Sequence, residues 1–150
     1  MKYIYRRMLE EDVYRVHEIE KSVFQDPWPT DAFVRDIKDT EIAFPYILAV
    51  GNMIIGYSVC WYYVGELHIG NIAVKKEYQG QGYGQMLLDK IMHMFQASRC
   101  AYLEVRESNR TALNLYMKNN FNVLYKRKSY YKNGEDALIL IRYNDQVERE

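Results

Sequence analysis

The sequence predicts a single mixed α/β domain over residues 1–150, in which helices flank a central, mostly antiparallel sheet. Short runs in which apolar and polar residues alternate predict strands, and segments with apolar residues three and four positions apart predict helices. A glycine-rich stretch, Gln79–Gly84, joins a predicted strand to a predicted helix. A chain of 150 residues can bury roughly 68–70 % of its unfolded surface, so no disulfide or metal is needed to stabilise it.

The first half of the chain is predicted to hold two helices and four strands. In order, these are a strand over residues 2–8, a helix over 9–24, a helix capped by Thr30, and strands over 44–50, 53–63 and 67–74. Thr30 suits an N-cap because its hydroxyl can accept a backbone N–H, and Asp31 suits the first turn. Residues 42–64 carry no charge and are long enough to cross a bilayer, but Pro45 and the turn pair Gly51-Asn52 favour two buried strands.

The second half is predicted to continue with a helix that begins near Gly82. A strand over 100–106, a helix from Ser108 or Asn109 to about 118, and strands over 121–131 and 137–143 joined at Asn133-Gly134 follow it. The element order is therefore β-α-α-β-β-β-α-β-α-β-β. The glycine-rich loop leaves the carboxyl end of a central strand, where open sheets usually bind ligands. The charged residues 145–150 are expected to fray.

The charge balance and the cysteines exclude several classes of protein. Twenty basic and twenty acidic side chains give no net charge, so neither nucleic acid nor a membrane is predicted as a partner. Cys60 and Cys100 lie in apolar, strand-like runs, which predicts reduced, buried thiols in a cytoplasmic protein, and charged residues interrupt any signal peptide. No metal is expected, because His17, His68 and His93 lack the spacing of metal ligands.

The glycine-rich stretch is predicted to bind a pyrophosphate. Glycines at positions 80, 82 and 84 remove the Cβ atoms that would hold an anion away from the backbone, so several N–H groups can converge on it. The following helix would add the positive end of its dipole. A Walker loop is excluded because no Gly-Lys-Ser/Thr follows, and the glycine spacing disfavours a Rossmann turn. The alternative is a plain connecting loop.

Two adjoining segments, Asn71–Val74 and Glu77–Gly84, resemble the acetyl-CoA motif of the GNAT family of N-acetyltransferases. That motif reads Gln/Arg-x-x-Gly-x-Gly/Ala, and Gln79, Gly82 and Gly84 occupy its fixed positions. The resemblance implies a GNAT-like fold with acetyl-CoA as cosubstrate. The residues it assigns to acetyl-CoA are Ile72, Ala73, Val74, Gln79, Gly80, Gln81, Gly82, Tyr83, Gly84 and Gln85.

A second motif begins in the strand over residues 100–106. Glu104 lies among apolar neighbours, where it is either a surface residue of the sheet or a base, and Tyr116 is either a core residue or a proton donor. The run Glu104-Val105-Arg106-x-x-Asn109, followed by Leu115-Tyr116, resembles the last coenzyme A motif of the same family. The resemblance implies that Glu104 accepts the proton, Tyr116 donates one and Asn109 contacts the cofactor. Asn119-Asn120 departs from the family's glycine, although Asn tolerates a left-handed helix end.

The resemblance covers nearly the whole chain and extends to the branch that acetylates the N-terminal alanine of a small-subunit ribosomal protein. Trp28, Tyr130 and Tyr131 are predicted to line the peptide groove, with simple packing as the alternative. Residues 26–41 hold five acidic and two basic side chains, a local charge of −3 that suits a basic peptide or a solvated helix face. Two rival functions remain open: acetylation of a small amine or antibiotic, and coenzyme A sensing without catalysis.

Overall fold

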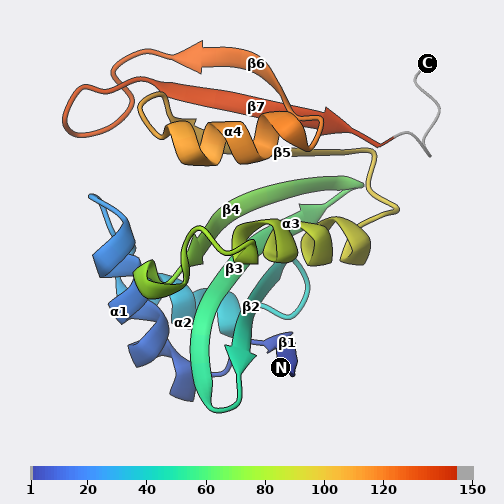
Figure 1. Ribbon diagram of the computed structural model, residues 1–150. Helices are drawn as coiled ribbons and strands as arrows, with labels where there is room; N and C mark the ends of the chain where they lie inside the picture. The colour runs from blue at the N-terminus through green and yellow to red at the C-terminus, as the bar shows by residue number, and fades with distance from the viewer. Residues whose placement is uncertain (1, 145–150) are drawn as a thin grey trace. The chain divides into compact units, whose positions relative to one another are not determined.

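The computed structural model describes residues 2–144 and contains the predicted elements in the predicted order (Figure 1). Its strands are β1 (Tyr3–Arg7), β2 (Ala43–Val50), β3 (Met53–Tyr63), β4 (Glu66–Val74), β5 (Cys100–Arg106), β6 (Asn122–Arg127) and β7 (Ala137–Tyr143). Its helices are η1 (Glu10–Asp12), α1 (Val13–Val23), α2 (Thr30–Lys38), η2 (Lys76–Tyr78), α3 (Tyr83–Met94) and α4 (Arg110–Lys118). The hydrogen-bonded strand order is β1-β2-β3-β4-β5-β7-β6. The predicted mixed sheet is thereby confirmed.

The chain divides into two compact units. Unit 1 comprises residues 2–62 and 70–94, and unit 2 comprises residues 63–69 and 95–144. The strand β4 therefore gives its first residues to unit 2 and its last residues to unit 1. The charged residues 145–150, which were expected to fray, lie outside the described part of the chain. Among residues 2–144, no helix is long and apolar enough to cross a membrane.

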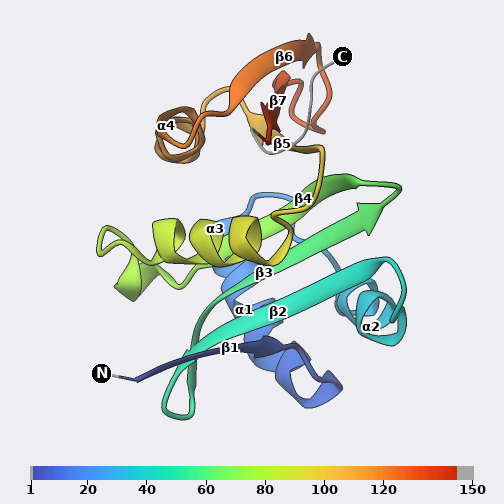
Figure 2. The same cartoon turned by 90° about the vertical axis from the view of Figure 1, so that its right-hand side faces the viewer.

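Unit 1 is built on an antiparallel sheet with helices on both faces (Figure 2). On one face, α1 and α2 pack in a core cluster that includes Val16, Phe33 and Tyr57. On the other face, Leu87 of α3 packs against Ile55 and neighbouring residues. Burial of these side chains supplies the main driving force for folding of the unit.

Two helix starts differ from the sequence prediction. The helix predicted over residues 9–24 begins with the 3₁₀ turn η1, because the carboxylate of Asp12 accepts the Leu9 N–H at 2.8 Å and pairs with Arg6 at 2.7 Å. The second helix has Pro29, not Thr30, as its N-cap, and Thr30 is its first residue. Proline lacks the N–H that would have no helical partner at this end, so it opens a helix without cost.

Close packing of α3 on the sheet depends on Gly56 of β3. A Cβ at this position would lie 2.8 Å from the carbonyl oxygen of Ala73 and 3.2 Å from a methyl carbon of Leu87. Contacts under 3 Å to backbone atoms cannot be relieved by a side-chain rotation. Gly56 therefore lets β3 lie close to the Ala73 carbonyl of β4 and to Leu87 of α3.

Unit 2 pairs the start of β4 with β5 in parallel and then adds β7 and β6 in antiparallel order. The strand predicted over residues 121–131 is shorter than expected, because β6 ends at Arg127. The chain turns after it because Ser129 takes a φ of +52° and the N–H groups of Tyr130 and Tyr131 both donate to the carbonyl oxygen of Glu135. Tyr130 and Tyr131 thus belong to a loop.

The helix α4 ends in a Schellman motif. Asn120 adopts a φ of +71° and donates its N–H to the carbonyl oxygen of Met117, while Phe121 donates to Tyr116 at 3.0 Å. The rings of Tyr116 and Phe121 meet edge to face with centroids 5.6 Å apart. This is the apolar contact that accompanies the motif. Asn120 therefore does stop the helix as a glycine would, and the stop fixes the position of Tyr116.

Candidate functional site

The glycine-rich loop of unit 1 has the backbone that an anion site requires. Gly80 and Gly82 have φ values of +77° and +90°, and a Cβ on either would meet no atom of the described residues within 4 Å. The open side of the loop is therefore available to a ligand. The first helical bond of α3 runs from the Met86 N–H to the carbonyl oxygen of Gly82 at 3.1 Å. The N–H groups of Tyr83 and Gly84 precede that bond and have no partner within the helix.

The strand that leads into the loop is anchored on both faces. Ala73 belongs to the core cluster beneath α1 and α2, and Val74 to the cluster beneath α3. Ile72 is half-buried against the second cluster. The side chain of Tyr83 is 9 % exposed and donates to or accepts from the hydroxyl of Tyr3 at 3.2 Å, so any contact of Tyr83 with a ligand uses its backbone.

The three glutamines assigned to the cofactor all bind the protein itself. The Gln79 amide donates to the carbonyl oxygen of Val74 at 2.9 Å and ties the loop to the end of β4. Gln81 donates to the carbonyl oxygen of Glu77 at 3.2 Å, and Gln85 to the carboxylate of Asp89 at 2.8 Å. These side chains shape the loop and the first turn of α3.

Trp28 lies in the loop between α1 and α2 and takes part in an aromatic group of unit 1. Its ring stacks on Trp61 with centroids 5.8 Å apart and lies 5.6 Å from Phe33. Trp61 in turn covers Gly70, where a Cβ would lie 2.2 Å from the indole ring. One side of Trp28 is therefore packed, and the ring as a whole is half-buried.

Glu104 lies in the middle of β5 in unit 2, on the face opposite to Leu103 and Val105, as the alternation predicts. Its carboxylate is 28 % exposed and lies 3.6 Å from the Arg127 guanidinium. A hydrogen bond with Glu104 raises the pKa of Tyr130 above its ordinary value. Glu104 therefore sits in a partly hydrated group of polar side chains, which suits a residue that exchanges protons.

His68 belongs to the same group of side chains. Its ring stacks on Tyr102 at 4.7 Å, and burial lowers its pKa although the charge of Glu104 acts in the opposite direction. A neutral imidazole is therefore favoured.

The loop that carries Tyr130 and Tyr131 is held by Arg106 and Glu135. The Arg106 guanidinium stacks 3.9 Å from the Tyr131 ring centroid and pairs with the Glu135 carboxylate at 3.0 Å. Glu135 also accepts the N–H of Ser108 at 2.8 Å, and its bonds to Ser108 and Arg106 lower its pKa. Tyr130 remains 45 % exposed, which leaves its ring accessible to a peptide.

Tyr116 and Asn109 both lie on α4. Tyr116 is 4 % exposed and its ring meets that of Phe121, so it has a structural role whatever its chemistry. The Asn109 side-chain oxygen caps the helix by accepting the Ala112 N–H at 3.2 Å. Of the two predicted caps, Ser108 and Asn109, the structure selects Asn109, and any cofactor contact uses the rest of its side chain.

The acidic segment 26–41 does not present all its charges to a partner. Asp36 is buried and bonds Trp61, and the carboxylate of Asp39 accepts the N–H groups of Glu41 and Ile42 at 3.0 Å each. Two of the five acidic side chains are therefore occupied by the fold, which weakens the case for this segment as a basic-peptide surface.

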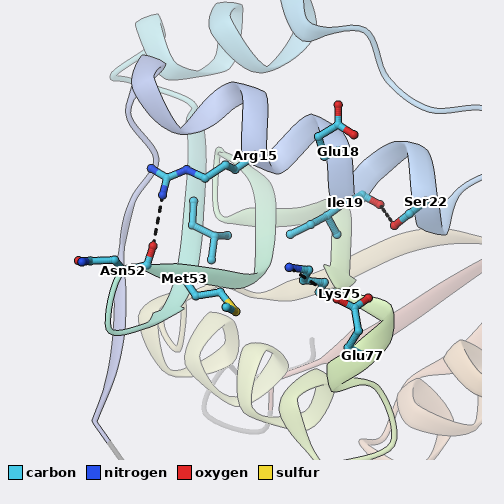
Figure 3. A pocket seen from close by; sticks show the side chains of 9 residues that line it. Arg15, Glu18, Ile19, Ser22, Asn52, Met53, Lys75 and Glu77 are labelled. Atoms are coloured by element: carbon cyan, nitrogen blue, oxygen red, sulfur yellow. Dashed lines mark hydrogen bonds and ion pairs between the residues drawn. The ribbon is translucent and has the colours of Figure 1, made fainter.

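One pocket of unit 1 contains none of the predicted site residues (Figure 3). It has a volume of about 400 Å³ and lies between α1, the β2–β3 turn and η2. Its charged groups are already paired: Arg15 donates to the carbonyl oxygen of Asn52 at 3.2 Å, and Lys75 lies 3.6 Å from Glu77. Nothing in this pocket resembles a reactive centre. No cluster of three metal-ligating side chains occurs among residues 2–144.

The sequence prediction missed Glu20, a carboxylate of α1 that is 1 % exposed. It accepts hydrogen bonds from the Trp28 backbone, the Tyr57 hydroxyl and the Asn71 amide, and burial raises its pKa. The signal in the sequence was a glutamate at a helical position otherwise occupied by apolar residues, between Val16 and Val23. The sequence could not reveal its partners.

Comparison with known proteins gives consistent results. The profile of the acetyltransferase (GNAT) family matches residues 13–121. A candidate ribosomal protein bS18-alanine N-acetyltransferase of Bacillus subtilis (strain 168) is 37 % identical over 138 residues, which cover 90 % of this chain and 91 % of that protein. The ribosomal protein bS18-alanine N-acetyltransferase of Haemophilus influenzae is 33 % identical over 138 residues, which cover 88 % of this chain and 92 % of that protein. The crystal structure of the ribosomal-protein-S18-alanine N-acetyltransferase from Escherichia coli superimposes with a TM-score of 0.89 at 25 % sequence identity. The superposition covers 99 % of this chain and 98 % of that one.

Proposed function

The chain belongs to the GNAT family of acetyltransferases, and from this premise we propose that its acceptor is the N-terminal alanine of a small-subunit ribosomal protein, bS18. Enzymes of this family use acetyl-CoA, so the chain is an acetyl-CoA-dependent N-acetyltransferase. The observation that carries the choice of acceptor is similarity along almost the entire chain to proteins named for that reaction. A single catalytic domain over residues 1–150 and a cytoplasmic location, where ribosomal proteins are made, are part of the proposal.

The glycine-rich loop fits the cosubstrate. The open, left-handed glycines Gly80 and Gly82 and the N–H groups of Tyr83 and Gly84 would hold the pyrophosphate of acetyl-CoA, and the backbone of Ile72–Val74 would pair with its pantetheine arm. Acetyl-CoA supplies an activated thioester when bound, so no nucleophile of the protein is required.

Glu104 is proposed to take the proton of the attacking amine, directly or through a water. An α-amino group has a pKa of about 7.7–8.0 and lysine about 10.4, so deprotonation of lysine at neutral pH costs about 3.4 kcal/mol more. A single carboxylate with 28 % exposure suits the easier substrate. Tyr130 and Tyr131, in the loop held by Arg106, are proposed to contact the peptide.

Tyr116 is proposed to protonate the departing thiolate. The Schellman end of α4 and the contact with Phe121 hold its ring in one place, which is the requirement for a positioned acid. Asn109, at the first turn of the same helix, is proposed as a further contact of the cofactor.

A direct assay tests the acceptor. Purified enzyme is given acetyl-CoA and a peptide that begins with the N-terminal alanine of bS18, and free thiol and peptide mass are followed. The matched control is the same peptide with a blocked N-terminus and an internal lysine. Acetylation of the first peptide alone supports the proposal, whereas faster acetylation of a polyamine or aminoglycoside would favour the small-amine alternative. Coenzyme A binding without turnover of any acceptor would identify a sensor.

A further inference from the structure

The buried carboxylate of Glu20 connects three separate elements of unit 1. Its Oε2 accepts the backbone N–H of Trp28 at 3.0 Å, and its Oε1 accepts the hydroxyl of Tyr57 and the Nδ2 of Asn71, the latter at 2.5 Å. These donors come from the α1–α2 loop, β3 and β4. Burying an ionised carboxylate is costly unless hydrogen bonds compensate it, and the three donors offset part of that cost here.

This arrangement determines the orientation of the Asn71 amide. An ionised carboxylate only accepts hydrogen bonds, so Asn71 must turn its NH₂ group towards Glu20. Its side-chain oxygen then points elsewhere, and it accepts no hydrogen bond from any residue among 2–144. Asn71 is only half-buried, so this oxygen can take a donor from a ligand.

Asn71 also stands at a distinctive place in β4. The alternation of buried residues in this strand is interrupted at Gly70–Ile72, where three consecutive positions are half-buried. Asn71 points to the face of α1, whereas its neighbour Ile72 packs towards α3. The free oxygen therefore lies one residue before the backbone that is proposed to pair with the pantetheine arm of acetyl-CoA.

We propose that the Asn71 side-chain oxygen binds an N–H of the acceptor amine, and that Glu20 is the positioning residue that holds it in that orientation. An amine has N–H donors in addition to the lone pair that attacks, so an acceptor oxygen can orient it without consuming the nucleophile. The same carboxylate accepts the backbone N–H of Trp28, a residue predicted to line the peptide groove. Glu20 therefore holds both the α1–α2 loop and the Asn71 side chain in position. This inference rests on the proposed function, because it assumes an amine acceptor.

The chemistry of Glu20→Gln makes the proposal specific. The Trp28 N–H is a backbone donor and cannot rotate away, so the substituted side chain must offer it the amide oxygen and turn its NH₂ towards Tyr57 and Asn71. The Tyr57 hydroxyl can accept one of those hydrogens, but Asn71 must flip to accept the other. The flip replaces the outward oxygen with an outward NH₂, which cannot accept from an amine.

The test is a double-mutant cycle in which the KM of the peptide and the Kd of acetyl-CoA are measured separately for each variant. Asn71→Ala and Glu20→Gln should each raise the KM of the alanine peptide by about tenfold, the effect of one lost hydrogen bond, with the acetyl-CoA Kd from calorimetry unchanged. The double variant Glu20→Gln/Asn71→Asp restores a donor-to-carboxylate pair with an outward oxygen, and should return the KM to within about threefold of wild type. Glu20→Gln combined with Asn71→Ala should be no worse than Asn71→Ala alone.

Tyr5→Phe is the matched control for a lost interior hydrogen bond. The Tyr5 hydroxyl and the Ser58 hydroxyl of β3 are 2.8 Å apart, and neither belongs to the Glu20 cluster. It should lower the melting temperature without changing the peptide KM. If Glu20→Gln and Asn71→Ala behave like Tyr5→Phe, the cluster serves stability alone and the inference is overturned. If wild type acetylates a polyamine and no peptide, the proposed acceptor fails, and the inference then requires Asn71→Ala to raise the KM of that polyamine.

Discussion

Replacing Gly82 by valine separates the role of the glycine-rich loop in binding from its role in folding. Gly82 has a φ of +90°, and a Cβ there meets no atom of residues 2–144 within 4 Å. The side chain of Gly82→Val would therefore enter the space in which a ligand is expected, and not the protein interior. Any effect on folding must come from the backbone alone.

The expected size of each effect follows from the geometry. A β-branched residue held at a positive φ costs about 1–3 kcal/mol, which corresponds to a loss of roughly 2–12 °C in melting temperature for a chain of this length. Hydrogen bonds to a charged group contribute about 1.5–3 kcal/mol each, so losing two backbone bonds to a pyrophosphate weakens binding by about 3–6 kcal/mol. The acetyl-CoA Kd should thus rise by roughly 10²–10⁴-fold.

Isothermal titration calorimetry with acetyl-CoA measures the binding term, and thermal denaturation followed by circular dichroism measures the folding term. Gly51→Val is the matched control, because Gly51 also has a positive φ, +59°, and open space around its Cβ, but lies in the β2–β3 turn. It should lose stability and keep its affinity. A folded Gly82→Val protein with wild-type affinity would refute the assignment of the loop.

Four further outcomes are expected. Tyr116→Phe should lower kcat by on the order of 10²–10⁴ with acetyl-CoA binding unchanged, and full activity would leave Tyr116 a packing residue only. Glu104→Gln should lower kcat/KM by about 10²-fold at neutral pH, and the loss should shrink as the peptide amine deprotonates at higher pH; an unaltered pH profile would transfer the base role to another group. Asn120→Val should destabilise the protein by about 1–2 kcal/mol in denaturant titrations, whereas Asn120→Gly should not. Burial raises the pKa of Glu20, so the folded state holds the carboxyl proton of Glu20 more tightly than the unfolded chain does. The contribution of Glu20 to stability therefore decreases as pH rises through its folded pKa. Melting temperatures of Glu20→Gln, measured against pH, should lack this decrease.

The elements that could be predicted are those whose signal is local. The alternation around Glu104 gives its face of β5 correctly, and the side chain of Asn109 caps α4 as its position suggests. The element order and the family are likewise confirmed. The roles of Glu104 and Tyr116 remain predictions, because chemistry depends on a bound substrate.

What could not be predicted depends on contacts between residues distant in sequence. The strand β6 stops at Arg127 because the N–H groups of Tyr130 and Tyr131 bond Glu135 across a loop, and alternation alone extends a strand through such a turn. Glu20 was visible as a carboxylate in an apolar stripe, but its donor on β4 is 51 positions away. Polar clusters of this kind are fixed only by the assembled fold.

The hydrogen bond from Gln79 to Val74 gives a new meaning to the first position of the acetyl-CoA motif. That position takes glutamine or arginine, which share a long side chain ending in N–H donors. The Val74 carbonyl oxygen, 2.9 Å from the Gln79 amide, needs such a donor to keep the loop folded back on the strand it leaves. Glutamate, similar in length and shape, would place two acceptors against that carbonyl. The first position of the motif therefore closes the loop against the strand, whereas the glycines that follow leave the space in which a ligand can bind.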